Sequence, residues 1–168
     1  MKNGKLNICL KFASYNNSLN LGKVKRCKMN NEDFNIDALR NAFDALKDCW
    51  TVYTQKKDDT ALADIVADSC VKRFEYTMET ALKLMRKYLK LVYAKDDKEL
   101  TVNNIFRLMA GYDMVANWEN WKLYYAKRND TSHEYNIAKA RELLKIMPDF
   151  INDIDFLIRA FDGAGQRD

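Results

Sequence analysis

Residues 60–94 read TALADIVADSCVKRFEYTMETALKLMRKYLKLVYA, and this stretch predicts one long helix that forms the spine of the protein. Its apolar residues recur at spacings of three and four, which is the period of one face of a helix. At about 1.5 Å per residue the helix would be roughly 50 Å long. The predicted buried face consists of Leu62, Ile65, Val66, Cys70, Phe74, Met78, Ala81, Met85, Tyr88 and Val92.

The segment before the spine predicts another amphipathic helix. It begins near Asn35, whose side chain is a good N-cap, and it ends at the charged run of residues 56–59. Apolar side chains recur through it at spacings of three and four, which gives one continuous stripe. The stripe consists of Ile36, Leu39, Phe43, Leu46, Trp50 and Tyr53.

Two more helices are predicted after the spine. Thr101 is placed to cap a short helix that Gly111 ends, because glycine readily takes the conformation found just after a helix. Asp113 can then cap a helix over residues 114–127. Aromatic residues at helical spacing usually lie in a core or a dimer interface, and base stacking is the alternative. Here they are Trp118, Trp121 and Tyr125 on one stripe, with Tyr124 beside it.

The last predicted helix covers residues 136–163 and contains the one proline, Pro148, which should kink it by removing a backbone donor. Together the patterns predict an all-α protein, an antiparallel up-and-down four-helix bundle with one short extra helix. We place the bundle at residues 34–162, between a disordered or loosely attached arm (1–33) and a frayed C-terminus (163–168). The apolar face of the last helix consists of Ile137, Leu144, Met147, Ile151, Ile154, Ile158 and Phe161.

The first 28 residues differ in charge from the rest of the chain. They hold seven of the 28 basic residues and none of the 24 acidic ones, so residues 29–168 carry 21 basic and 24 acidic residues, a net charge of −3. Binding to a polyanion must therefore depend on a local cluster or on the arm. Because Met29 opens a sequence typical of a normal start, residues 1–28 are either an upstream extension or a basic arm that gathers RNA.

The composition is that of an ordinary globular domain, with 48% hydrophobic and 31% charged residues. There is no run of about 18 apolar residues and no apolar core of a secretory signal, so we expect a cytoplasmic protein that does not span a membrane. Cys9, Cys27, Cys49 and Cys70 form no C-x-x-C pair, and with a single histidine they give no zinc site. Cys49 and Cys70 lie within helical patterns and should pack as small apolar residues.

Residues 128–135, RNDTSHEY, concentrate groups that handle phosphate. Arg128 carries a permanent charge on a fork of donors suited to phosphate oxygens. His133, the only histidine, can transfer a proton near neutral pH. The same stretch is ordinary turn and N-cap chemistry, so a capping or surface role for His133 is the alternative.

The spine carries a second candidate site over residues 73–79, RFEYTME. Arg73 and Thr77 stand one turn apart and share a face. Glu75 and Glu79 do the same. The segment is either an exposed charged face or the wall of a cleft or docking surface, with Arg73 as a second phosphate or carboxylate contact. Because the two glutamates lack the neighbouring ligands of a metal site, we predict no metal here.

The motif Arg-Asn-x-x-Ser-His-x-Tyr at residues 128–135 resembles the signature of the HEPN superfamily. More narrowly, the chain resembles the branch called nucleotidyltransferase substrate-binding proteins, partners of minimal nucleotidyltransferases in toxin and antitoxin pairs. Residues 73–79 are similar to the charged and aromatic helix of that branch, and the resemblance covers residues 35 to about 161. Leu82 departs from the pattern, because relatives often have tryptophan before the lysine that corresponds to Lys83.

The resemblance implies a metal-independent endoribonuclease, without a cofactor, whose site lies at the seam of a homodimer. His133 would be the acid or base, Arg128 would stabilise the phosphate, and Asn129 would orient the phosphate or the imidazole ring. In related toxins with His-x-Tyr at this position, the partner nucleotidyltransferase blocks activity by attaching AMP to the tyrosine, here Tyr135.

The chemistry of RNA cleavage agrees with a dimer. The reaction needs a base, an acid and a cation, and one subunit offers a single imidazole, so a two-fold pair of subunits would supply both proton carriers. Two other functions remain open: a non-catalytic subunit that binds nucleotide or presents a substrate to the nucleotidyltransferase, and a helical dimer with an interaction role.

Overall fold

A computed structural model describes residues 34–56, 60–132 and 137–165, and within these ranges every regular element is a helix. This confirms the all-α prediction. The arm at residues 1–33 lies outside the described residues, so its predicted looseness stays a prediction. The elements are α2 (Asp37–Lys56), α3 (Thr60–Tyr93), a 3₁₀ turn (Asp97–Glu99), α4 (Val102–Gly111), α5 (Trp118–Ser132), α6 (Ile137–Lys145) and α7 (Met147–Gly165).

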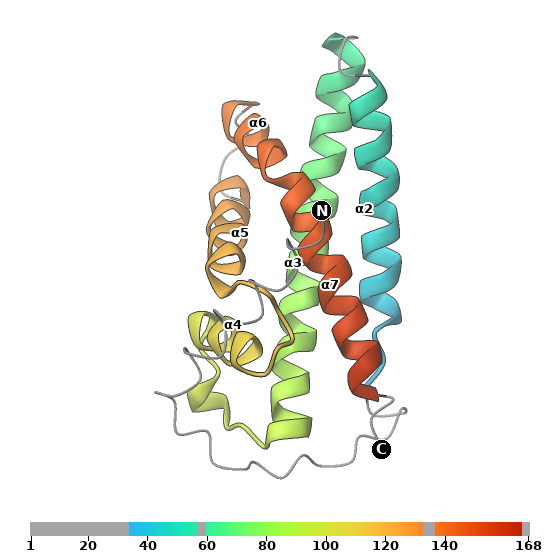
Figure 1. The fold of residues 1–168 in the computed structure, drawn as a ribbon. Coiled ribbons are helices and arrows are strands. Elements are labelled where there is room, and N and C mark those ends of the chain that lie inside the picture. Colours follow the sequence, from blue (N-terminus) through green and yellow to red (C-terminus); the bar gives the residue numbers. More distant parts are fainter. Residues whose placement is uncertain (1–33, 57–59, 133–136, 166–168) are drawn as a thin grey trace, which may run out of the picture.

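The helices α2 and α3 form a long hairpin, and the other helices pack against it below its tip (Figure 1). The α7 helix crosses this hairpin, while α5 and α4 lie along the other side of α3. The predicted stripes supply the core between these helices: Leu39, Leu46, Phe74, Met85 and Ile154 are fully buried. None of the described helices has both the length and the apolar character needed to cross a bilayer.

The first turns of α3 depart from the prediction. Ile65 and Leu62 were expected in the core, but their side chains are 68% and 37% exposed. Both residues lie near the tip of the α2–α3 hairpin, which extends beyond α6 and α7 (Figure 1). The α6 helix approaches this part of α3 with a charged side chain, since Arg141 pairs with Asp64 at 3.9 Å, and this contact does not bury Leu62 or Ile65. From Cys70 to Val92 the predicted face is buried as expected.

The connection from α4 to α5 also differs. Asp113 does not cap a helix; its backbone is left-handed (φ 58°), and the helix begins five residues later at Trp118. The cap is Asn117, whose side-chain oxygen accepts a hydrogen bond of 2.9 Å from the backbone N–H of Glu119. The helix α5 continues to Ser132 rather than ending at residue 127, so Arg128 lies inside it.

Pro148 divides the predicted last helix in two instead of kinking it. The α6 helix ends at Lys145, and Pro148 is the second residue of α7, where the amide that proline lacks is not needed. The carbonyl of Ile146 accepts from Phe150 N (3.0 Å) and starts the new ladder of hydrogen bonds.

Cys49 and Cys70 are both buried between α2 and α3, with their sulfur atoms 2.9 Å apart. Burial raises the pKa of the Cys70 thiol, and the neighbouring Cys49 adds to the shift. The two side chains therefore pack as small apolar groups, as predicted. Cys9 and Cys27 lie outside the described residues.

Candidate ligand pocket between α3 and α5

One face of α5 is fixed against α7 by aromatic packing and a polar contact. Tyr124 is 1% exposed, lies edge-on to Phe150 (5.0 Å between ring centroids), and donates its hydroxyl to the carboxylate of Asp153 at 2.7 Å. Asn120 donates to the same carboxylate oxygen at 3.1 Å. Burial raises the pKa of Tyr124, and the hydrogen bond to Asp153 raises it further, so the phenol stays protonated. The protonated phenol can then keep its hydrogen bond to α7, which holds α5 in place.

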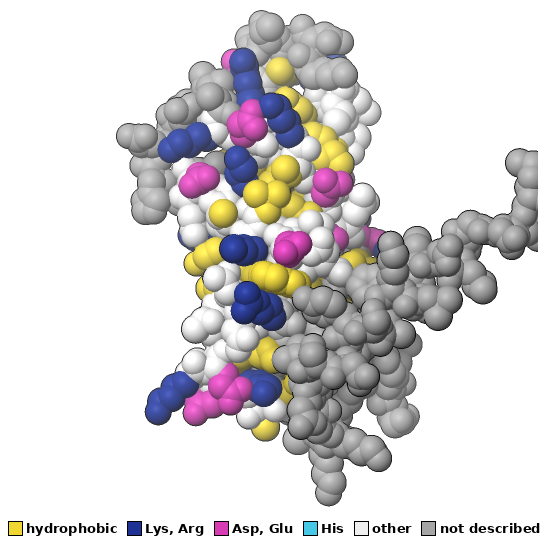
Figure 2. Space-filling model, turned by 60° about the vertical axis from the view of Figure 1, so that its left-hand side comes forward, with side chains coloured by type: hydrophobic (Ala, Val, Ile, Leu, Met, Phe, Trp, Pro, Cys, Tyr) yellow, Lys and Arg dark blue, Asp and Glu magenta, His cyan; other side chains and the backbone are white. Residues whose placement is uncertain are grey.

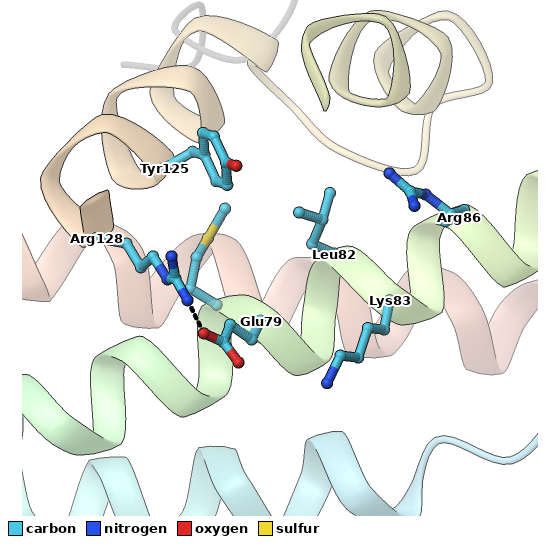
Figure 3. Close-up of a pocket in the computed structure, with 7 residues that line it drawn as sticks. Glu79, Leu82, Lys83, Arg86, Tyr125 and Arg128 are labelled. Atoms are coloured by element: carbon cyan, nitrogen blue, oxygen red, sulfur yellow. Dashed lines mark hydrogen bonds and ion pairs between the residues drawn. The ribbon is translucent and has the colours of Figure 1, made fainter. Parts of the chain in front are cut away.

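Arg128 follows Tyr124 by one turn of α5 and lies at the edge of a pocket. Its guanidinium forms an ion pair with the carboxylate of Glu79 on α3 (Figure 3). It also donates to the side-chain oxygen of Asn129 at 3.2 Å. The side chain of Arg128 is 28% exposed and that of Glu79 is 41% exposed. The cation is therefore oriented from two sides yet still reachable by a ligand.

The pocket has a volume of about 330 Å³ and lies between α3 and α5. Tyr125 reaches into it from α5, beside Arg128, while Leu82 and Arg86 stand on α3 across from it (Figure 3). Its walls therefore combine charged ends, one of them the Glu79–Arg128 ion pair, with an apolar middle. The lining residues are Met78, Glu79, Leu82, Lys83, Arg86, Tyr125 and Arg128.

The predicted residues of the 73–79 segment do not all reach this pocket. Glu79 lines it, as the cleft interpretation requires. Thr77 is fully buried and its hydroxyl donates to the carbonyls of Arg73 (2.7 Å) and Ala42 (3.3 Å), so it links α3 to α2 instead. Arg73 is exposed beside Ser69, and Glu75 pairs with Lys72 at 2.9 Å.

The sequence prediction passed over Arg86 as a site residue and treated Lys83 only as a position of resemblance. It considered Tyr125 for base stacking, as the alternative to a place in the core or a dimer interface. A signal was present, because Glu79, Lys83 and Arg86 are spaced by four and three residues and so share a face of α3. The spacing does not indicate which helix lies opposite this face of α3, and in the structure that helix is α5.

His133 and Tyr135 lie outside the described residues, and so do the contacts they make. The described chain reaches Ser132 at the end of α5 and resumes at Ile137. Arg128 stands five residues before His133 in the sequence, on the last turns of the helix that leads to it.

Basic, acidic and apolar side chains lie interspersed on the side of the molecule formed by α4, α5 and α6 (Figure 2). Within the described ranges, no three His, Cys, Asp or Glu side chains gather where a metal ion would be held.

Comparisons with known proteins agree on one family. The family model described as nucleotidyltransferase substrate binding protein like matches residues 34–162. A curated relative from Haemophilus influenzae, named probable ribonuclease HepT, is 24% identical over 146 residues, which span 83% of this chain and 100% of the relative.

A solved structure from Haemophilus influenzae is similar in fold, with a TM-score of 0.65 and 25% sequence identity. The superposition covers 74% of this chain and 97% of that one. Its published description gives it the fold of a substrate binding domain of a nucleotidyltransferase. The helical arrangement is thus shared across nearly the whole of the known structure.

Proposed function

This chain belongs to the family of nucleotidyltransferase substrate binding proteins within the HEPN superfamily, and from that premise we propose that it is the toxin of a toxin–antitoxin pair. In this proposal it is a metal-independent endoribonuclease that acts as a homodimer. A cognate minimal nucleotidyltransferase neutralises it. The relative named probable ribonuclease supports the activity.

The observation that carries the proposal is the setting of Arg128. A half-buried guanidinium, paired with Glu79 and supported by Asn129, stands at the rim of a pocket just before the segment that contains His133. Such a cation stabilises the negative charge that develops on phosphorus when a 2′-hydroxyl attacks it. Arg128 would stabilise the phosphate, and Asn129 would orient the phosphate or the imidazole ring.

The proton transfers fall to His133. One imidazole removes the proton of the 2′-hydroxyl and another protonates the leaving 5′-oxygen, which requires two copies of His133 from two subunits at one cleft. RNA that enters the cleft would then lie between two guanidinium groups and two imidazoles.

Regulation would act on Tyr135. Transfer of AMP from ATP to its hydroxyl, with release of pyrophosphate and the hydroxyl proton, would place a bulky anion two residues from His133. There it would repel the RNA phosphate and fill the cleft. A mass increase of one AMP on the peptide that contains Tyr135, after co-expression with the nucleotidyltransferase, tests this step.

The test of the activity compares the wild-type chain with His133→Ala and Arg128→Ala, each expressed without the partner. We expect growth arrest and RNA fragments with 2′,3′-cyclic phosphate ends from the wild type, and neither from the two variants. Arg40→Ala is the matched control, because Arg40 also forms an ion pair with a carboxylate, Asp162, between two helices away from the pocket. Full cleavage by His133→Ala would overturn the proposal.

The pocket also favours a second candidate, a non-catalytic subunit that binds a nucleotide or presents a substrate to the nucleotidyltransferase. Its basic and apolar lining can hold a nucleotide without any contribution from His133. Harmless expression of the wild type, together with nucleotide binding, would favour this candidate over the toxin.

A further inference from the structure

The pocket between α3 and α5 contains more positive charge than a single phosphate at Arg128 requires. Glu79 and Arg128 neutralise one another at one end. Lys83 and Arg86 stand further along α3, and no carboxylate within the described ranges forms an ion pair with either. Their charge is therefore available to a second anionic group of a ligand.

The positions of Arg86 and Arg128 set the shape of that ligand. Arg86 is seven residues from Glu79, which corresponds to about 10 Å along the helix. One of its amino groups donates to the carbonyl of Leu100 at 3.3 Å, which fixes the side chain and leaves other donors of the guanidinium. Figure 3 shows Arg86 and Arg128 on opposite sides of Leu82, so a ligand that reaches both must cross the apolar middle.

The apolar middle is suited to a flat group. Met78 and Leu82 lie on the α3 side, and Tyr125 lies on the α5 side. The ring of Tyr125 lies edge-on to that of Phe106, with 6.4 Å between the ring centroids, so one side of the tyrosine contacts the core while it also lines the pocket. A nucleobase stacks on such a ring whatever its identity. The volume of about 330 Å³ is at the lower end of small-molecule sites, of about 300–1,000 Å³.

We propose that this pocket is a nucleotide subsite. The base packs between Tyr125 and Leu82, Arg86 holds the phosphate next to the one at Arg128, and Lys83 adds positive charge on the α3 wall nearer to Glu79 (Figure 3). The inference rests on the proposed function for the role of Arg128. The subsite residues position the substrate and do not take part in the cleavage of RNA. The nucleotide is a residue of the RNA strand or a free nucleotide, since both present the same base and phosphate.

The test measures equilibrium binding of the full chain to a short single-stranded RNA of mixed sequence with 2′-fluoro groups, which transesterification does not cleave. The double variant Lys83→Ala/Arg86→Ala should weaken binding at least about tenfold. It should also lower the slope of log affinity against log salt by about 0.7, the value for one phosphate on a single strand. AMP and ATP are tested as competitors to separate the free nucleotide from the RNA residue.

The matched control is Lys87→Ala/Lys122→Ala, which removes the same charge from exposed positions of α3 and α5 that do not line the pocket. A second pair of variants tests the stacking surface: Tyr125→Phe keeps the ring and should keep the affinity, whereas Tyr125→Leu should weaken it at least about fivefold. Circular dichroism and thermal unfolding establish that each variant is folded.

The outcomes separate this inference from the proposed function, because binding is measured without cleavage. Selective loss of RNA or AMP binding in the pocket variants supports the subsite, even if the wild type cleaves no RNA. Equal losses in both double variants, or no loss in either, overturn it and leave a ribonuclease that depends on His133 untouched.

Discussion

Tyr124 and Tyr125 are adjacent in α5 but have different surroundings. Tyr124 is buried and hydrogen-bonded to Asp153 of α7, whereas Tyr125 is partly exposed and lines the pocket beside Arg128. The face of α5 that carries Tyr124 is apolar and closely packed. The face that carries Tyr125 presents an aromatic ring and the cation of Arg128 to a ligand. Because α5 is fixed against α7 on one face, it can hold the pocket residues of its other face in place.

This division has a geometric basis. Neighbouring residues of a helix differ by about 100° in direction, so a single turn can serve both a core and a site. Arg128 stands four residues after Tyr124 and three after Tyr125, between the two faces. The core contact therefore lies within one turn of the cation that it positions.

The strongest way to break the packed face is Phe150→Ala. Phe150 is fully buried and its ring contacts those of Phe74 (4.5 Å), Trp121 and Tyr124. Removing it should lower the free energy of unfolding by about 3–5 kcal/mol, because the ring leaves a cavity. Urea unfolding followed by circular dichroism measures this change.

The control for Phe150→Ala is Phe156→Ala on the same helix, where the side chain is 38% exposed and little should change. Equal losses for the two variants would contradict the assignment of α7 as the support of α5. At temperatures where Phe150→Ala remains folded, its RNA affinity should fall as well, since Arg128 loses its fixed position.

A smaller break is Tyr124→Phe, which removes the hydroxyl but keeps the ring. The lost hydrogen bond to the Asp153 carboxylate should lower the free energy of unfolding by about 1.5–3 kcal/mol. The pKa of Tyr124 is raised in the folded state, so its contribution is complete below the usual tyrosine pKa of about 10 and is lost as the pH rises above that value.

The pH dependence of the free energy of unfolding provides a control for Tyr124→Phe. Between about pH 10 and the onset of alkaline unfolding, the stability of the wild type should fall more steeply than that of Tyr124→Phe. Chemical unfolding at a series of pH values measures both slopes. Parallel slopes would mean that Tyr124 does not stay protonated in the fold.

Much of the packed face was predictable from the sequence. Spacings of three and four placed Leu39, Phe74, Met85 and Ile154 in the core, because helix geometry alone decides which side chains share a face. The prediction was wrong for Ile65, because its burial depends on whether neighbouring helices cover that part of α3. Local geometry determines a face, whereas tertiary structure decides whether it is covered.

The start of α5 was mispredicted for a different reason. Asp113 and Asn117 are both good N-cap residues, and nothing local distinguishes them. The structure uses Asp113 for a left-handed turn that buries Met114 and Val115, and it uses Asn117 as the cap. The burial of two apolar side chains thus decides between equivalent caps.

The pocket was the least predictable part. Glu79 and Arg128 are 49 residues apart in the sequence, and their ion pair exists because α5 lies across α3. The sequence identified Arg128 from its motif and Glu79 from a resemblance to a charged helix. It did not place Lys83, Arg86 and Tyr125 around the same space, because that requires the relative position of two helices.

The mildest change concerns the pocket face, and it is Glu79→Gln. A phosphate that binds Arg128 must take the place of the Glu79 carboxylate or share the guanidinium with it. Neutralising the carboxylate removes both the competition and a repulsive charge from the pocket. Because partly exposed ion pairs contribute about 0.2–1 kcal/mol, the affinity for the 2′-fluoro RNA should rise by up to about fivefold.

Asp162→Asn provides the comparison, since it removes the same kind of carboxylate from the Arg40 ion pair, remote from the pocket. If both variants bind RNA equally more tightly, the effect is general charge, and the pocket has no special part in it. If Glu79→Gln binds more weakly than the wild type, the ion pair holds Arg128 in its binding orientation, and orientation outweighs competition. A gain confined to Glu79→Gln means that the fold already orients Arg128 through α5, and that Glu79 then acts mainly as a competitor for the phosphate.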